Sequence, residues 1–340
     1  MDLMLNLDIK KPVKQIAYGN KILLTGSCFT EHIGDALAEL KFSVLQNPNG
    51  ILFDPVSVCS SLVSYTQNRQ YTEDDLFQLN EIWHSWQHHS RFSGIDKNAS
   101  LKAINDSQTQ AHEFLKQADW LIITLGSAFS YRLTREAKFL QTSDTVKKRD
   151  AEEPVANCHR APAQWFHKHL LSIDEIVTQL DNCYHQLIRF NPSLQIIFTV
   201  SPVRHIRDGV VDNNRSKARL LESVHHMVNK FDHLYYFPAY ELVIDVLRDY
   251  RFYDIDLVHP NYMATEFVVE KFAAACITEE SRALMQEIKK IAIARRHKPF
   301  QPATTAHRQF LKTHFEKTRL LATQYPFLDF TEELAYFSGE

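Results

Sequence analysis

The chain has 340 residues, with 38 basic side chains against 41 acidic ones, a formal net charge of −3 and 44% hydrophobic residues. This composition is typical of a globular protein, and the length suits one large domain with an appendage. The slightly negative charge gives no electrostatic case for binding nucleic acid. Since no apolar run approaches the roughly 18 residues that a membrane-spanning helix needs, we expect no membrane span.

The numbers and spacing of cysteine and glycine residues argue against several further classes of protein and of binding site. The five cysteines form no C-x-x-C pair, which argues against a disulfide framework or a cysteine zinc site and favours the cytoplasm. The segment Met1–Asp8 is acidic and lacks a continuous apolar core, so we expect no signal peptide. Only eight glycines occur, and none has the spacing of a dinucleotide motif, a P-loop or a nucleophile elbow.

Short apolar runs predict five buried strands along the chain. They cover residues 21–25, 42–45, 120–125, 195–200 and 234–237. Their nearly continuous hydrophobicity is typical of a parallel sheet covered on both faces. Helical patterns separate them, at about 30–40, 55–67, 99–117, 173–190, 213–230, 239–249 and 262–275. This alternation predicts an α/β fold, a three-layer α/β/α sandwich with a mostly parallel sheet.

Two stretches depart from this alternation. Residues 130–171 have mixed charge and no clear periodicity, so we expect either a functional loop region or partial disorder. After about residue 277 the pattern is purely helical, and we divide the chain into a catalytic domain, 1–276, and a helical extension, 277–340, packed on it. Thr278 can cap the first helix of this extension, and its apolar stripe is Leu284, Ile288 and Ile291.

The helical extension is strongly basic. Residues 282–319 hold a surplus of eight positive charges. The favoured interpretation is a pair of solvated helix faces on an acidic body. A basic arm for an anionic partner is the alternative.

Two motifs carry the candidate chemistry. Ser27 follows the first strand directly, in the run Thr25-Gly26-Ser27-Cys28-Phe29-Thr30, where a ligand crevice is expected in an open α/β sheet. Asp256 and His259 stand three residues apart before the last helix of the body, so the carboxylate can orient the imidazole toward a serine. Cys28 invites a thiol mechanism, but a buried structural cysteine is the favoured interpretation.

This order of motifs resembles that of the SGNH (GDSL-like) hydrolases. The residues within the motifs resemble those of one branch, the GSCFA family. The resemblance covers nearly the whole chain. It is carried by residues 26–30, 47–50, 125–128, 157–159, 201–205, 248–253 and 256–260. It implies ester chemistry with Ser27 as nucleophile, His259 as general base and Asp256 as the orienting acid. Gly50 would lend a backbone N–H to the oxyanion hole, beside that of Ser27.

The chain departs from the SGNH pattern at two positions. Gly26 stands where these hydrolases usually have aspartate, and the block usually written G-x-N-D begins Gly126-Ser127, without the asparagine donor. Either Ser127 or Asn157 replaces that donor, or hydrolysis is poor, since losing one donor costs about 10²–10³ in rate.

Further polar residues are candidates for contact with substrate: Asn157, His159, Arg204, His205 and His89. His84 and His88 have helical metal-ligand spacing, but a polar network is favoured, and we expect neither metal nor cofactor.

The leading functional hypothesis is an ester hydrolase acting on a carbohydrate or another small acyl ester. An O-acyltransferase with the same triad and a non-catalytic module that binds glycan or protein are the alternatives. The sequence leaves the oligomeric state open.

Overall fold

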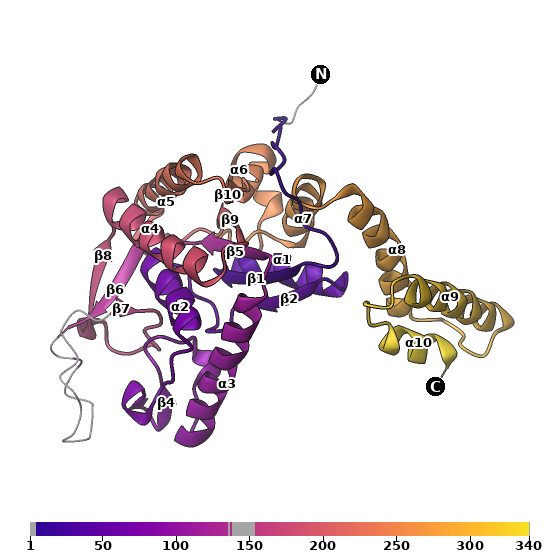
Figure 1. The fold of residues 1–340 in the computed structure, drawn as a ribbon, viewed down its shortest axis with the longest axis horizontal. Helices are drawn as coiled ribbons and strands as arrows, with labels where there is room; N and C mark the ends of the chain where they lie inside the picture. Colours follow the sequence, from indigo (N-terminus) through magenta and orange to yellow (C-terminus); the bar gives the residue numbers. More distant parts are fainter. Residues whose placement is uncertain (1–4, 135–136, 138–153, 340) are drawn as a thin grey trace.

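A computed structural model describes residues 5–134, 137 and 154–339, and its centre is a five-stranded sheet (Figure 1). The strands are β1 (Lys21–Gly26), β2 (Ser43–Gln46), β5 (Trp120–Leu125), β9 (Gln195–Val200) and β10 (Leu234–Tyr236). Their order is β10-β9-β5-β1-β2, and every pair of neighbours is parallel. The strand predictions are confirmed to within one residue at each end, because β1, β5 and β9 are nearly continuous buried apolar runs.

Helices cover both faces of this sheet, so the expected three-layer sandwich is confirmed. One face carries α1 (Cys28–Glu39), α6 (Ala239–Glu241), a π-helical turn over Leu242–Leu247, and α7 (Tyr262–Cys276). The other carries α2 (Pro55–Gln67), α3 (Lys97–Lys116), α4 (Ile173–Phe190) and α5 (Val210–Lys230). Alternate side chains of β5 enter the two cores: Ile122 lies in the first, whereas Leu121 and Ile123 lie in the second.

The strand order fixes where a ligand crevice can open. The chain moves outward from β1 to β2 and then returns to the other side of β1 to form β5. In an open parallel sheet, ligands bind beyond the carboxyl ends of the strands where the winding direction reverses. That reversal lies between β1, which ends at Gly26, and β5, which ends at Leu125.

The stretch 130–171 contains more regular structure than expected. Strands β6 (Phe129–Leu133), β7 (Pro154–Val155) and β8 (Phe166–Leu170) form a small antiparallel sheet. The expectation of loop or disorder is therefore wrong for these strands: β6 alternates apolar and polar residues, as a half-buried antiparallel strand does. Residues 135–136 and 138–153 of the stretch lie outside the described residues. A separate hairpin joins β3 (Phe77–Leu79) and β4 (Ile82–His84).

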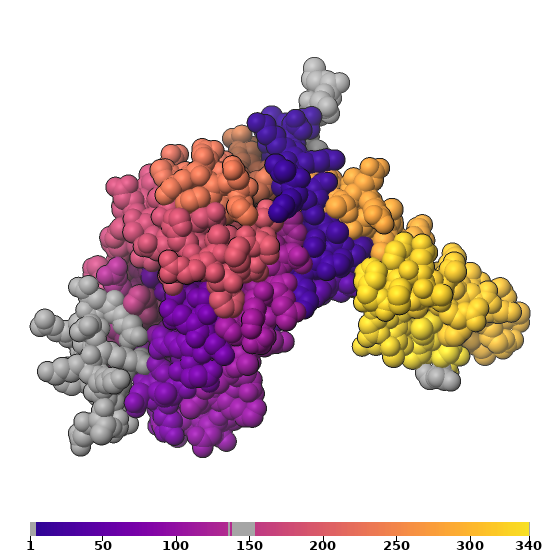
Figure 2. Space-filling model, in the orientation of Figure 1, coloured from indigo at the N-terminus to yellow at the C-terminus, as the bar shows by residue number. Residues whose placement is uncertain are grey.

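From residue 278 onward the described chain forms three helices, α8 (Glu279–Arg296), α9 (Thr305–Gln324) and α10 (Thr331–Ser338). Thr278 caps α8 by accepting from Ser281 N, and the stripe of Leu284, Ile288 and Ile291 is buried. These helices project from one side of the body (Figure 2). Phe330 joins the core that contains Tyr18 and Phe42, and Lys41 pairs with Glu333 at 3.0 Å. No helix in the described parts of the chain has the length and apolarity to cross a bilayer.

Candidate functional site

Ser27 stands at the turn from β1 into α1. As the N-cap of α1, its Oγ accepts from Phe29 N at 3.3 Å, and its own N–H donates to Thr124 O at 3.0 Å. Only 2% of the residue is exposed. The turn is therefore fixed by the neighbouring strand β5, and the hydroxyl lies at the positive end of a 12-residue helix.

The residue before Ser27 has to be glycine in this fold. Gly26 has a φ of +145°, and a Cβ built on it would stand 2.2 Å from Thr124 O. Its N–H donates to Asn47 Oδ1 at 2.9 Å, which ties the Ser27 turn to the loop after β2. The close approach of β5 thus explains why an aspartate cannot occupy position 26.

Gly50 closes a tight turn in that loop. Its φ is +81°, its N–H donates to Asn47 O at 2.7 Å, and a Cβ would stand 2.1 Å from His89 Cβ. Gly50 is thus linked to the Ser27 turn through Asn47, and His89 lies against it. The N–H groups of Ser27 and Gly50 both donate to backbone carbonyls here, so an oxyanion would have to share or displace these bonds.

Four residues converge on the end of β5. A Cβ on Gly126 would lie 3.3 Å from Ser27 Cβ, 3.3 Å from His205 Nε2 and 2.9 Å from Phe53 Cβ. His205 therefore lies beside Ser27 at the end of β5, as expected from its position after β9. Burial lowers the pKa of His205 to about 4, with smaller contributions from the charges of Lys217 and His259. The imidazole is neutral at pH 7 and can accept or donate a hydrogen bond.

Ser127 follows Gly126 and is buried. Its Oγ accepts from Phe129 N at 3.1 Å and lies 3.3 Å from the hydroxyl of Ser216 on α5, which in turn accepts from Ala128 N at 2.7 Å. When Ser216 donates to Ser127, the hydrogen of the Ser127 hydroxyl remains available for a ligand.

Asp256 and His259 form a hydrogen-bonded pair on one loop. Asp256 Oδ2 lies 2.7 Å from His259 Nδ1, and Oδ1 accepts from the backbone N–H groups of Val258 and His259. These bonds, that from the imidazole foremost, lower the pKa of Asp256 to about 2. The carboxylate is thus ionised and fixes the imidazole so that Nε2 is the nitrogen left to act as a base.

Arg204 joins this loop to the end of β9. Its backbone N–H donates to Val258 O at 3.2 Å, and its guanidinium donates to Leu257 O at 3.3 Å and lies over the ring of Tyr253. These contacts support a positioning role for Arg204. The side chain of His259 is 47% exposed, and among the described residues no hydrogen bond joins it to Ser27. Their contact stays a prediction.

Asn157 and His159 lie in a separate aromatic cluster. Asn157 Oδ1 accepts from His159 N at 2.9 Å, and the His159 ring packs against those of Phe77, His84 and Trp86. His159 Nε2 bonds to Ser85 O at 2.7 Å, and burial lowers its pKa to about 4. These contacts give both residues a structural environment, and their contact with substrate stays a prediction.

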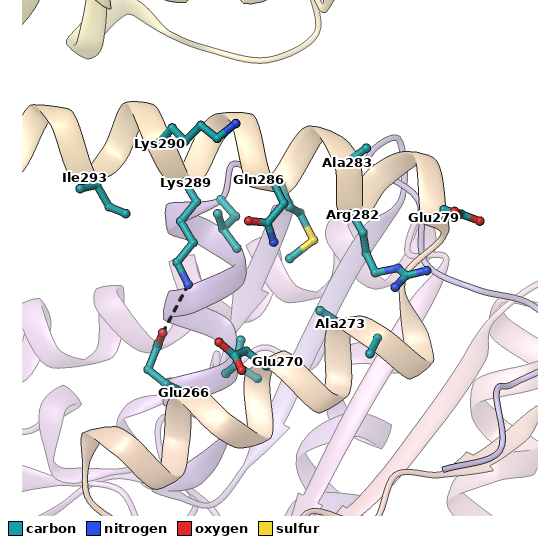
Figure 3. A pocket seen from close by; sticks show the side chains of 14 residues that line it. Glu266, Glu270, Ala273, Glu279, Arg282, Ala283, Gln286, Lys289, Lys290 and Ile293 are labelled. Carbon is teal, nitrogen blue, oxygen red and sulfur yellow. Dashed lines mark ion pairs between the residues drawn. The ribbon is translucent and has the colours of Figure 1, made fainter. Parts of the chain in front are cut away.

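Two alternatives to a serine site are a thiol nucleophile and a metal centre. Burial, with a contribution from Glu31, raises the pKa of the Cys28 thiol, so the reactive thiolate is disfavoured. Within the described ranges no group of three or more His, Cys, Asp or Glu side chains could hold a metal ion. A hollow of about 680 Å³ lies elsewhere, between α7 and α8, where Lys289 pairs with Glu266 (Figure 3).

The sequence interpretation missed the contribution of α5. Asn213, Ser216 and Lys217 are buried and contact the loops that follow β5 and β9. The available signal was their i, i+3, i+4 spacing, which places three polar side chains on one helix face. That face should otherwise be apolar, because the rest of it, such as Leu220 and Val224, enters the core.

Comparison with known proteins agrees with the architecture. The GSCFA family model matches residues 21–272, from β1 into α7, and the model described as the C-terminal domain of GSCFA domain proteins matches residues 288–340. No curated protein matches the chain. The first match covers well over half of the sequence and includes Ser27, Asp256 and His259. The chain therefore belongs to the GSCFA family.

Proposed function

We propose that this protein is a serine-dependent, SGNH-like ester hydrolase with Ser27 as nucleophile, His259 as general base and Asp256 as the orienting acid. The observation that carries the proposal is the convergence of Ser27, His205 and Gly126 where β1 and β5 end. This is the edge of a parallel sheet at which ligand crevices form. The buried Ser27 turn is rigid, as a nucleophile in a defined geometry requires.

The proposed mechanism uses the ionised Asp256 carboxylate and the free Nε2 of His259. Ser27 Oγ attacks the acyl carbonyl while His259 Nε2 takes its proton, and Asp256 stabilises the imidazolium that forms. His259 then returns the proton to the departing alcohol. Water, activated by the same imidazole, releases the acid from the acyl-enzyme. The step requires the exposed loop of His259 to bring Nε2 to about 3 Å from Ser27 Oγ when substrate binds.

The oxyanion is stabilised by Ser27, Gly50 and Ser127 in this proposal. Ser127 replaces the missing asparagine: its Oγ already accepts from Phe129 N, so its own hydrogen can point to the substrate oxygen. The backbone N–H groups of Ser27 and Gly50 can also donate to the oxyanion, once they release or share the carbonyl oxygens to which they now donate. A donor that exists before substrate arrives costs the least reorganisation, which favours Ser127 as the main contributor.

The proposed substrate is an acyl ester of a carbohydrate or another small molecule. His205 is the polar side chain best placed to contact it, since its Nε2 faces the Gly126 turn. His89, Asn157, His159 and Arg204 would contact more distant parts of a larger substrate. A cytoplasmic location fits the cysteines, since all five are free thiols.

The experiment that tests the proposal is covalent labelling with a fluorophosphonate, followed by mapping of the modified residue. We expect labelling at Ser27, no labelling of Ser27→Ala, and nearly normal labelling of Cys28→Ala. Hydrolysis of short acyl esters measured on the same proteins should follow the labelling. Labelling that survives in Ser27→Ala and disappears in Cys28→Ala would replace this mechanism with a thiol one. No labelling and no turnover in the native chain would favour a binding module.

A further inference from the structure

The first half of α5 presents a buried polar face to the loops that follow β5 and β9. Asn213 Oδ1 accepts from His205 N at 2.9 Å, and the hydroxyl of Ser216 accepts from Ala128 N. One turn of helix thus holds the backbone of two loops, the one after β5 and the one after β9. Lys217, the next residue along, binds both loops at once.

Lys217 continues the contact between β5 and β9 where their ladder ends. The last ladder pair is Leu125 and Val200. Beyond it, Lys217 Nζ donates to Gly126 O and to Ser201 O, each at 2.6 Å. The ammonium thus bridges the first carbonyls after the two strands, beside the backbone bond that Ser201 N donates to Leu125 O at 2.8 Å.

Gly126 lies in close contact with both Ser27 and His205. A Cβ added to Gly126 would lie 3.3 Å from Ser27 Cβ and from His205 Nε2, so the three residues are packed closely together. Because Gly126 lies against both groups, a shift of its turn by about 1 Å would displace the Ser27 nucleophile or the His205 imidazole. Such a displacement is enough to cost about a hundredfold in rate.

The buried charge of Lys217 has no carboxylate partner in the described residues. The side chain is 1% exposed, and its two hydrogen-bond partners are neutral carbonyls. Burial lowers the pKa of Lys217 to about 7. The titratable groups that interact with it electrostatically are the Cys28 thiol on α1 and the His205 imidazole after β9. A buried charge without an ion-pair partner is costly, so such groups concentrate at functional sites.

We infer that Lys217 is a positioning residue for the proposed reaction, fixing the Gly126 turn against Ser27 and placing a positive charge behind the developing oxyanion. This rests on the proposed function only for its second part. The first part concerns the native fold and can be tested without turnover. Arg219, two residues along α5, supplies a matched control, because its guanidinium also donates to two carbonyls, those of Leu170 and Leu171.

The first measurement is amide hydrogen exchange in Lys217→Met and Arg219→Met. In Lys217→Met we expect at least tenfold faster exchange at Ser27 and Gly126, whose N–H groups donate to Thr124 O and Phe53 O. Arg219→Met should leave these amides unchanged and loosen the segment around Leu171. Unchanged exchange at Ser27 and Gly126 in Lys217→Met, or equal acceleration there in both variants, would overturn the positioning role.

The second measurement is the pH dependence of fluorophosphonate labelling at Ser27. The charge of Lys217 is lost as pH rises through about 7, so native protein should show a fall in labelling rate on that side. Lys217→Met should lose the fall and label at least tenfold more slowly at pH 6, whereas Arg219→Met keeps both features. An unchanged profile in Lys217→Met would refute the electrostatic role.

Two further outcomes separate a failure of the proposed function from a failure of the role of Lys217. If native protein is not labelled at all, the proposed function fails, and hydrogen exchange still decides the positioning role. If Lys217→Met does not fold, the lysine Nζ signal of ¹⁵N-labelled native protein replaces it. That signal should titrate near pH 7 and shift when Ser27 is modified. A Lys217 signal that keeps its normal titration, or ignores the adduct, would refute the electrostatic role.

Discussion

Gly26 and Thr124 stand so close that a single carbon atom added to Gly26 would lie 2.2 Å from the Thr124 carbonyl oxygen. The Thr124 oxygen also accepts the N–H of Ser27, so one carbonyl of β5 both requires glycine before the nucleophile and anchors the nucleophile itself. The departure from the SGNH pattern at position 26 is thus a consequence of how tightly β1 and β5 approach each other.

The first prediction concerns Gly26→Ala. The positive φ and the contact with backbone together should lower the free energy of unfolding by about 2–5 kcal/mol. Urea denaturation measures the loss. Gly209→Ala is the control, since Gly209 has a φ of +84° and no atom within 4 Å of an added Cβ. It should lose only the cost of backbone strain, about 1 kcal/mol. Equal losses in both variants would show that the contact with Thr124 is absent.

The second prediction separates the roles of His259 and Asp256. His259→Ala should lower ester turnover by about 10³-fold or more, because it removes the base. Asp256→Asn should cost less, since the exposed imidazole can exchange this partner for water. Steady-state kinetics with a short acyl ester measure both. A larger loss in Asp256→Asn than in His259→Ala would contradict the assignment of His259 as base.

The third prediction concerns the Ser127 hydroxyl as oxyanion donor. Ser127→Ala should lower kcat about 10²-fold with little change in KM, because the bond forms fully only in the transition state. Ser216→Ala should cost less, since it removes only the group that orients Ser127. If Asn157→Ala lowers kcat more than Ser127→Ala does, Asn157 is the replacement donor.

Much of the fold could be predicted because strand and helix periods dominate where a segment is buried on a defined face. The runs at 120–125 and 195–200 coincide with β5 and β9 without error. The sheet of β6, β7 and β8 was not predicted, since its strands have only five, two and five residues and carry few apolar side chains. Residue 331, where α10 begins, was likewise not foreseen, because no N-cap side chain marks the start of this short helix.

The two motifs of the candidate site can be proposed from the sequence, and their roles stay predictions, whereas the residues that support them could not be foreseen. Ser27, Asp256 and His259 lie in recognisable local sequence motifs, so the sequence alone identifies them as candidates. Lys217 does not, because a lysine on a helix is normally solvated, and only the three-dimensional position of α5 shows that this one is buried. The occupied N–H groups of Ser27 and Gly50 are equally invisible to sequence, since they depend on the register between strands and turns.

The last prediction is a loss of stability in mild acid. Burial lowers the pKa of His88 to about 3 and the pKa values of His159 and His205 to about 4, below the usual value of 6.5. As pH falls below 6.5, the unfolded chain takes up these protons while the native state resists them. Stability is therefore complete above 6.5 and declines steadily toward pH 4, by up to about 1.4 kcal/mol per pH unit for each imidazole.

Urea midpoints at pH 7, 6 and 5 measure this decline in stability. The variant His88→Gln isolates the part of the decline that comes from one imidazole. His88 is the most buried of the three histidines, and its Nδ1 lies 2.9 Å from Ser85 Oγ. The variant should be less stable at pH 7, because that contact is lost. Its stability should also fall less steeply with acid, by about 1 kcal/mol per pH unit, since one proton uptake has been removed. A slope that stays the same in His88→Gln would mean that this imidazole is protonated in the native protein, and its burial among Tyr71 and Phe92 would then need revision.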